Sequence, residues 1–389
     1  MPSALLVDTS FSSWPILEAL ERRGITVHVV GGNPADALAK AHPRYHVVDY
    51  SDTQALARLV DVIGPDHLVP GCNDRSYIAC AEVAQARHFT GIDTPANTRT
   101  INDKSLFRAA ATCHGMSVPR VFDWPREAPD CAVIVKPVDA FSGRGVTVVA
   151  HADAAEIHAA VDKAKAESRS GYCLVEEFVE GPMYSHSAFL SEGRIAQDFW
   201  IIEHSSVNPF VVDTSHLALD LDPAVQDALR TEVERMAAAL GLVDGLFHSQ
   251  FIVSGKRHVV VEATRRCPGD LYSQLVQLST GFDYPDAYAA PYVGARVTPA
   301  DTAVKAPRFI MRHTLTGDVT TSLQHVQFQV PVQIERWVPL GSSGDLLRPS
   351  PQGRIAILFA RASSQEALLQ LAEATTAHAL YRINQGLEV

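Results

Sequence analysis

The stretch Val133-Ile-Val-Lys136-Pro-Val-Asp-Ala-Phe-Ser142-Gly143-Arg144-Gly145-Val146-Thr-Val-Val149 joins two short apolar runs through a loop that contains two glycines. This loop is too long for a two-residue hairpin turn, and its composition predicts a mobile connection. In a hairpin, the Lys136 ammonium could face the same space as the loop's backbone N–H groups, which glycines leave free to approach an anion. The stretch therefore predicts a phosphate clamp, although a solvated strand end and an ordinary turn would explain its two parts taken singly.

A second pattern follows about thirty residues later in Leu174-Val-Glu176-Glu177-Phe178-Val179-Glu180-Gly181. An apolar strand here ends in polar residues and a glycine. Such a strand end can offer backbone N–H and C=O groups to a purine edge, with a carboxylate beside them for an exocyclic amine. The alternative is a strand that simply leaves the core.

A third pattern is Glu262-Ala-Thr264-Arg265-Arg266-Cys-Pro-Gly269, which ends a strand paired with the strand that carries Gln250. The turn Ser254-Gly-Lys-Arg257 predicts that the two strands form a hairpin. Oxygen ligands at adjacent strand ends suit a hard cation such as Mg²⁺, and Arg265 or Arg266 could neutralise phosphoryl oxygens.

The flanking segments predict two further units. Strand and helix signals alternate over the first hundred residues, which indicates a doubly wound parallel sheet. Its first turn lacks G-x-G-x-x-G, so a dinucleotide site there is disfavoured. Asn73 and Asp74 follow a predicted strand, and loops at that edge of a parallel sheet face ligand crevices. From about Lys305 the pattern is typical of a small α+β unit.

Taken together and in this order, the patterns over roughly residues 100 to 300 resemble the ATP-grasp family. The flanking units resemble the arrangement found in biotin carboxylase and in amino-acid and peptide ligases such as the D-alanine ligases. The resemblance implies an α/β and α+β architecture in three parts: a 1–100 N-terminal domain, a two-lobed 101–304 ATP-grasp domain with a mobile small lobe at about 120–180, and a 305–389 C-terminal domain.

The resemblance also implies roles for individual positions. Lys104 and Lys136 would contact ATP phosphates, and the loop Ser142, Gly143, Arg144, Gly145 and Val146 would close over them. Glu176, Glu177, Phe178 and Val179 would line the adenine, and Glu262 would hold Mg²⁺ or Mn²⁺. Arg266, with Arg265 beside it, would match the arginine next to the transferred phosphate and the substrate carboxylate, and His248 falls where the D-alanine ligases place a phosphate-binding arginine.

Three positions depart from the family pattern. Met183 stands where a glutamate often binds the ribose, so Glu180 or Ser185 is expected to supply that contact. Gln250 replaces the first metal carboxylate, and Thr264 replaces an asparagine. Both can ligate Mg²⁺ through oxygen, but with less charge, so we expect weaker metal binding or help from Asp270 or the substrate. Asp270 and Tyr272 are also candidates for substrate contacts.

Composition excludes several other classes of protein. The net charge is −11, which disfavours non-specific binding of nucleic acid or acidic membranes. The six cysteines form no C-x-x-C pair, and H-E-x-x-H, G-x-S-x-G and P-loop motifs are absent. The first residues lack a basic segment, and no long apolar run occurs, so the sequence predicts a soluble cytoplasmic protein. A homodimer is common in the resembled family.

These observations predict an ATP-dependent carboxylate–amine ligase that releases ADP and phosphate and acts on small molecules. We expect an acyl phosphate to form and an amine, an amino acid in the leading hypothesis, to attack it. Two alternatives stay open: a bicarbonate-using carboxylase of the same fold, and a binding or regulatory protein with a degenerate nucleotide site.

Overall fold

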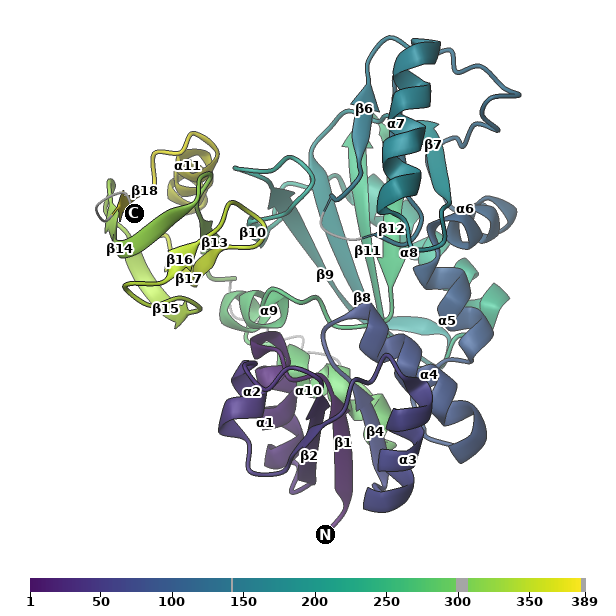
Figure 1. The fold of residues 1–389 in the computed structure, drawn as a ribbon, viewed down its shortest axis with the longest axis vertical. Helices are drawn as coiled ribbons and strands as arrows, with labels where there is room; N and C mark the ends of the chain where they lie inside the picture. The colour runs from purple at the N-terminus through teal and green to yellow at the C-terminus, as the bar shows by residue number, and fades with distance from the viewer. Residues whose placement is uncertain (141–142, 299–306, 386–389) are drawn as a thin grey trace.

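The computed structural model describes residues 1–140, 143–298 and 307–385 (Figure 1). Its N-terminal part is a parallel sheet in the order β3-β2-β1-β4. Because these strands are parallel, their carboxyl ends share one edge of the sheet, where the chain passes from β4 into α4. This confirms the predicted doubly wound unit. Its strands and helices are β1 Ser3–Val7, α1 Trp14–Arg22, β2 Thr26–Gly31, α2 Ala37–Ala41, β3 Tyr45–Val47, α3 Thr53–Ile63, β4 His67–Pro70 and α4 Asp74–Arg87.

A small antiparallel sheet, β6-β5-β7, forms the small lobe at the top of Figure 1. Val133 and Val135 alternate with Ile134 and Lys136 along β5, so the two pairs face opposite sides of the sheet. The valines pack in a core with α7, and the other face borders the main cavity. The elements of this lobe are β5 Val133–Pro137, β6 Thr147–Val149, α7 Ala154–Glu167 and β7 Cys173–Glu177.

The largest sheet has eight strands in the order β12-β11-β8-β9-β10-β13-β17-β15, with antiparallel pairing throughout. Apolar side chains on the β8, β11 and β12 part of one face pack with α6 and α8. The other face of β11 and β12 borders the cavity. The elements of this region are α5 Pro95–Asn102, α6 Lys104–Cys113, β8 Met183–Ser191, β9 Arg194–His204, β10 Thr214–Leu217, α8 Pro223–Leu240, β11 Gly245–Ser254, β12 Arg257–Thr264, α9 Tyr272–Thr280 and α10 Tyr284–Ala289.

The eight-stranded sheet continues across the predicted domain boundary at residue 305, because β13, β17 and β15 extend it beyond β10. The three domain ranges therefore stay a prediction. A further sheet, β16-β14-β18, and α11 complete the C-terminal part. The elements concerned are β13 Ile310–Thr316, β14 Thr321–Phe328, β15 Gln333–Pro339, β16 Leu346–Leu347, β17 Arg354–Arg361, α11 Gln365–Thr376 and β18 Tyr381–Gln385.

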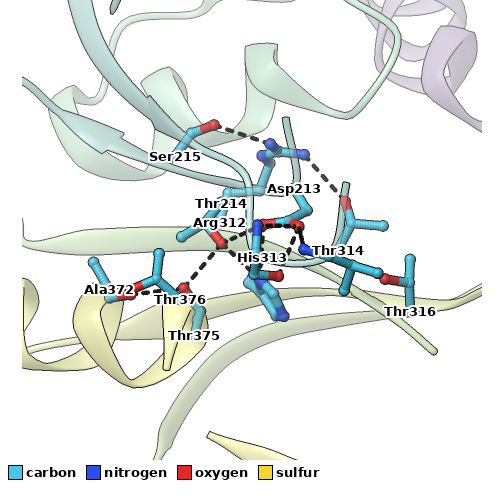
Figure 2. Close-up of polar contacts among 12 residues, drawn as sticks. Asp213, Thr214, Ser215, Arg312, His313, Thr314, Thr316, Ala372, Thr375 and Thr376 are labelled. Carbon is cyan, nitrogen blue, oxygen red and sulfur yellow. Dashed lines mark hydrogen bonds and ion pairs between the residues drawn. The ribbon is translucent and has the colours of Figure 1, made fainter. Parts of the chain in front are cut away.

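Buried polar contacts tie α11 to the large sheet (Figure 2). The Thr214 hydroxyl on β10 contacts Nδ1 of His313 on β13 at 2.8 Å and the Thr375 hydroxyl on α11 at 3.1 Å. Asp213, which precedes Thr214, accepts hydrogen bonds from the backbone N–H and hydroxyl of Ser206. The C-terminal part thus supports the loop between β9 and β10. Among the described residues, no helix has the length and hydropathy needed to cross a membrane.

Candidate active site

A cavity of about 1170 Å³ lies among the small lobe, the hairpin β11–β12 and the loop that joins β4 to α4. It brings together most of the residues that the sequence analysis selected. Those that line it are Lys104, Lys136, Gly143, Arg144, Val146, Glu176, Glu177, Phe178, Val179, Met183, His248, Gln250, Glu262, Thr264 and Arg266. Asn73, Asp74, Glu180, Asp270 and Tyr272 line it too, whereas Ser185, Gly145 and Arg265 do not. Ser142 lies outside the described residues.

One end of the cavity contains a buried charge cluster. Lys136 Nζ forms an ion pair with Glu176 Oε2, and Arg108 Nε on α6 donates to Glu176 Oε1 at 2.6 Å. Burial lowers the pKa of Lys136 although Glu176 opposes the shift. Burial alone would raise the pKa of Glu176, but the two cations outweigh it and hold this pKa below its usual value. The cluster therefore holds the Lys136 ammonium in place on β5.

The strand end beside this cluster has the edge expected for a purine, with one difference. Glu177 lines the cavity, but Arg257 on β12 donates to its two carboxylate oxygens at 2.6 and 3.0 Å. Those hydrogen bonds lower the pKa of Glu177. Its carboxylate is thus engaged, and the Phe178 N–H donates to the Ala132 carbonyl at 2.9 Å. The Phe178 carbonyl and Val179 are therefore left to offer the backbone edge of the strand end.

The glycine loop packs against the loop between β9 and β10. Gly143 has φ +68°, and a Cβ added to it would lie 2.5 Å from Cβ of Phe210. At the base of the same loop, Lys104 Nζ donates to the carbonyl oxygen of Ala140 at 3.3 Å. The two loops therefore meet over the cavity, and only a residue without a side chain fits at position 143.

The candidate metal ligands lie on neighbouring strands. Gln250 on β11 is directly paired with Glu262 on β12, so both side chains are on one face of the hairpin. Thr264 follows two positions later on the same strand, and its hydroxyl donates to Asp74 at 3.1 Å. Within the described part of the chain, no three histidine, cysteine, aspartate or glutamate side chains are placed to hold a metal. The oxygen donors of Gln250 and Glu262 fit Mg²⁺ if the ATP phosphates supply the remaining ligands.

The two adjacent arginines lie in different places. Arg266 lines the cavity, where Asp74 contacts its Nε at 2.8 Å and its Nη2 at 3.3 Å. Arg265 is 2% exposed and lies outside the cavity: its Nε donates to Asp93 at 2.7 Å and its Nη2 to the Val243 carbonyl at 2.5 Å. The expectation that Arg265 contacts phosphate is therefore corrected, because its guanidinium is used to hold Asp93 and a loop carbonyl.

His248 lies in the cavity wall but does not reproduce an arginine's charge. Its Nδ1 is 2.9 Å from the Ser187 hydroxyl. Burial, and then the nearby Arg266, lower its pKa to about 3. At neutral pH its imidazole is therefore uncharged, and it can offer a hydrogen bond but no positive charge to a phosphate.

The sequence analysis missed Glu203 and Arg312 at the other end of the cavity. Glu203 on β9 lines the cavity, is 7% exposed and accepts a hydrogen bond from Gln250 Nε2 at 2.6 Å. Burial, and then the nearby Asp270, raise its pKa to about 7. Arg312, fully buried on β13, pairs with Asp270 at 2.8 Å. A single carboxylate at the end of the apolar run Phe199-Trp-Ile-Ile was the available signal for Glu203.

The fold and the site together are typical of an ATP-binding enzyme with two lobes and a glycine-containing loop beside the cavity. Comparison with known proteins agrees. The ATP-grasp domain family matches residues 130–274. Over 313 residues, 75% of each chain, the protein is 29% identical to the formate-dependent phosphoribosylglycinamide formyltransferase of Thioalkalivibrio sulfidiphilus. The same enzyme of Burkholderia vietnamiensis is 32% identical over 176 residues, which is 42% of this chain and 43% of that protein.

Solved structures show the same fold. The L-amino acid ligase from Bacillus licheniformis superposes with a TM-score of 0.79 at 16% identity over 99% of each chain. Phosphoribosylglycinamide synthetase from Anaerococcus prevotii gives 0.77 at 16% identity over 99% of this chain and 100% of the other. Residues 130–274 thus match the ATP-grasp domain family, and the fold of the chain is the one found in ATP-grasp ligases, enzymes that in general use ATP and Mg²⁺.

Proposed function

We propose that the protein activates a small carboxylate as an acyl phosphate and joins it to an amine, with an amino acid as one substrate, releasing ADP and phosphate. The observation that carries the proposal is that Lys136 lines one cavity with Glu262 and Arg266, although it lies far from both in the sequence. The similarity to an L-amino acid ligase in fold supports an amino-acid substrate.

The chemistry requires activation because a carboxylate has a poor leaving group. Transfer of the γ-phosphoryl group of ATP to a carboxylate oxygen creates an acyl phosphate, and the amine then displaces phosphate from the acyl carbon. This transfer depends mainly on positioning and charge stabilisation, so it needs no protein nucleophile. Mg²⁺, held by Glu262 and Gln250, would offset the charge of the phosphates.

Different residues of the cavity would bind the phosphates and the substrate carboxylate. Lys136 would contact the phosphates, and its place on a buried strand keeps its position fixed. Asp74 binds Arg266 through Nε and Nη2, which leaves Nη1 for a substrate carboxylate or the transferred phosphate. The loop that carries Gly143 and the loop that carries Phe210 meet at the cavity, and together they would act as a lid that protects an acyl phosphate from water.

A second candidate function follows from the curated relatives. Their names state that formate is the acid and phosphoribosylglycinamide the acceptor. The identity of 29% over 75% of both chains favours testing this pair directly. A carboxylase that uses bicarbonate and a protein that binds ATP without turnover are the remaining alternatives.

The test is a turnover assay with purified protein, ATP and Mg²⁺ against four sets of substrates: amino-acid pairs, formate with phosphoribosylglycinamide, bicarbonate, and no addition. Release of ADP and phosphate with amino acids supports the proposal, and release confined to the second or third set supports the corresponding alternative. AMP and pyrophosphate would exclude the acyl-phosphate route. Tight ATP binding without turnover in any set would indicate a degenerate site. The homodimer and the cytoplasmic location stay predictions.

A further inference from the structure

Gln250 presents a problem of orientation. A carboxylate in its place would offer oxygen from either atom, whereas an amide has one oxygen and one NH₂ group, and only the oxygen binds a cation. The two orientations of the amide differ in energy only through the hydrogen bonds that its oxygen and its NH₂ group form. A glutamine can therefore serve a metal site only if another residue fixes which end faces the cation.

The sheet order supplies such a residue. The strands run β12-β11-β8-β9, so Gln250 on β11 lies between Glu262 on β12 and Glu203 on β9. Gln250 pairs directly with Glu262 on one side and with Ser185 of β8 on the other, and Met183 of β8 pairs with Glu203. Gln250 Nε2 donates to Glu203 Oε2 at 2.6 Å. The nitrogen of the amide is thus occupied on the side of β9, which leaves the oxygen available for a cation, and Glu262 lies on the strand at the opposite side of Gln250.

Glu203 is suited to hold this orientation. It lies on a strand paired on both sides, by β8 and β10, and its side chain is almost completely buried. No cation among the described residues forms an ion pair with it, so its oxygens are not drawn away from the amide. The Glu203 oxygen that Gln250 Nε2 contacts is an acceptor, and only the NH₂ end of the amide can donate to it.

We propose that Glu203 is a positioning residue for the metal site: it holds the NH₂ group of Gln250 so that the amide oxygen joins the Glu262 carboxylate in binding the Mg²⁺ of Mg·ATP. The carboxyl group that the resembled family has at the position of Gln250 on β11 is then replaced by one on β9, which acts through the amide. This inference rests on the proposed function for the identity of the nucleotide, but it concerns metal binding alone.

The experiment measures metal affinity rather than turnover. The full-length protein is saturated with ADP, and Mn²⁺ is titrated while the free ion is followed by electron paramagnetic resonance. Glu203→Gln should weaken Mn²⁺ binding about tenfold, the lower end of the effect expected when a group that orients a ligand is lost. The affinity for ADP in the presence of EDTA should stay within about twofold of wild type, because the residues proposed to contact the nucleotide lie in the small lobe and on α6, away from β9.

A double-mutant cycle separates positioning from direct ligation. Gln250→Ala removes the amide, so Glu203→Gln in that background should cause no further loss of Mn²⁺ affinity. An undiminished loss in that background would mean that Glu203 ligates the metal itself, and the proposal would be overturned. It would be overturned equally if Glu203→Gln alone left Mn²⁺ affinity unchanged. Mn²⁺ binds the ADP phosphates in every variant, so the affinity is measurable throughout.

Asp198→Asn is the matched control. Asp198 lies on β9 like Glu203, but it is outside the cavity, where it pairs with Arg230 at 2.7 Å. This variant removes a carboxylate from the same strand without touching the cavity, so it should leave Mn²⁺ affinity near the wild-type value. Thermal unfolding of each variant checks that the fold is kept. Because turnover is not measured, failure of the ligase assay and failure of this test are distinguishable.

Discussion

The two ends of the cavity are built in different ways. At the small-lobe end, Lys136 and Arg108 share the Glu176 carboxylate in a buried cluster. At the end lined by Glu203 and Asp270, Glu203 is buried without an ion pair among the described residues, while Asp270 pairs with Arg312 from a distant strand. The first end is held by strands of the small lobe together with α6, whereas the second depends on strands of the large sheet and on the loop that carries Asp270.

The largest effect is expected from replacing Lys136. Lys136→Met should lower turnover about 10²- to 10³-fold, because a preorganised cation is removed from the phosphates. Glu176 keeps Arg108 as a partner, so the fold should survive. Steady-state ADP release and the melting temperature measure the two effects. Lys163→Met is the control, since Lys163 lies on the exposed face of α7, outside the cavity, and its ammonium contacts the Thr147 hydroxyl at 3.3 Å. Full turnover in Lys136→Met would refute the role.

Replacing each adjacent arginine by lysine sharpens the contrast between structural and functional charge. Arg265→Lys loses the hydrogen bond to the Val243 carbonyl inside the core, so the free energy of unfolding should fall by about 2 kcal/mol with little change in turnover. Arg266→Lys should keep its ion pair with Asp74 and most of its stability but lose about 10- to 100-fold in turnover, since lysine cannot bind two oxygens in a fork. Urea denaturation and kinetics measure both. Interchanged results would contradict the assignment.

The two adjacent arginines also show how much of the site could be predicted from the sequence. Lys136, Glu262 and Arg266 were predictable because short motifs fix them relative to strands, and alternation along a strand fixes which face they share. The sequence could not decide between Arg265 and Arg266, because the residue that separates them is Asp93, about 170 positions away, which binds one and not the other. Glu203 was missed for the same reason: its importance depends on Gln250, two strands away in the sheet but 47 positions away in the chain.

The meeting of the two loops can be disturbed with one methyl group. Gly143→Ala places a Cβ 2.5 Å from Cβ of Phe210, so the lid must shift, and turnover should fall about tenfold while ATP hydrolysis without ligation rises. Gly171→Ala is the matched control, because Gly171 has φ +74° in the same lobe with nothing within 4 Å of the added atom. Both variants carry the backbone strain, and only the first carries the clash. The ratio of ligated product to ADP measures the effect, and equal ratios in the two variants would contradict it.

The smallest effect is expected from a change of pH, which should alter stability through a buried histidine of the large sheet. His216 on β10 is 3% exposed, and burial lowers its pKa from 6.5 to about 4. Neutral His216 is buried at no electrostatic cost above pH 6.5, the pKa of the unfolded state. As the pH falls from 6.5 toward 4, the unfolded state takes up a proton that the folded state does not, so the free energy of unfolding decreases. Between pH 7.5 and 5.0 the wild type should therefore lose about 2 kcal/mol of unfolding free energy that His216→Leu does not lose. Urea midpoints at the two pH values give the difference.

His151→Leu replaces an exposed histidine and is the control, so its stability should depend on pH as that of the wild type does. If the stability of His216→Leu also keeps the wild-type pH dependence, protonation of other groups controls acid stability.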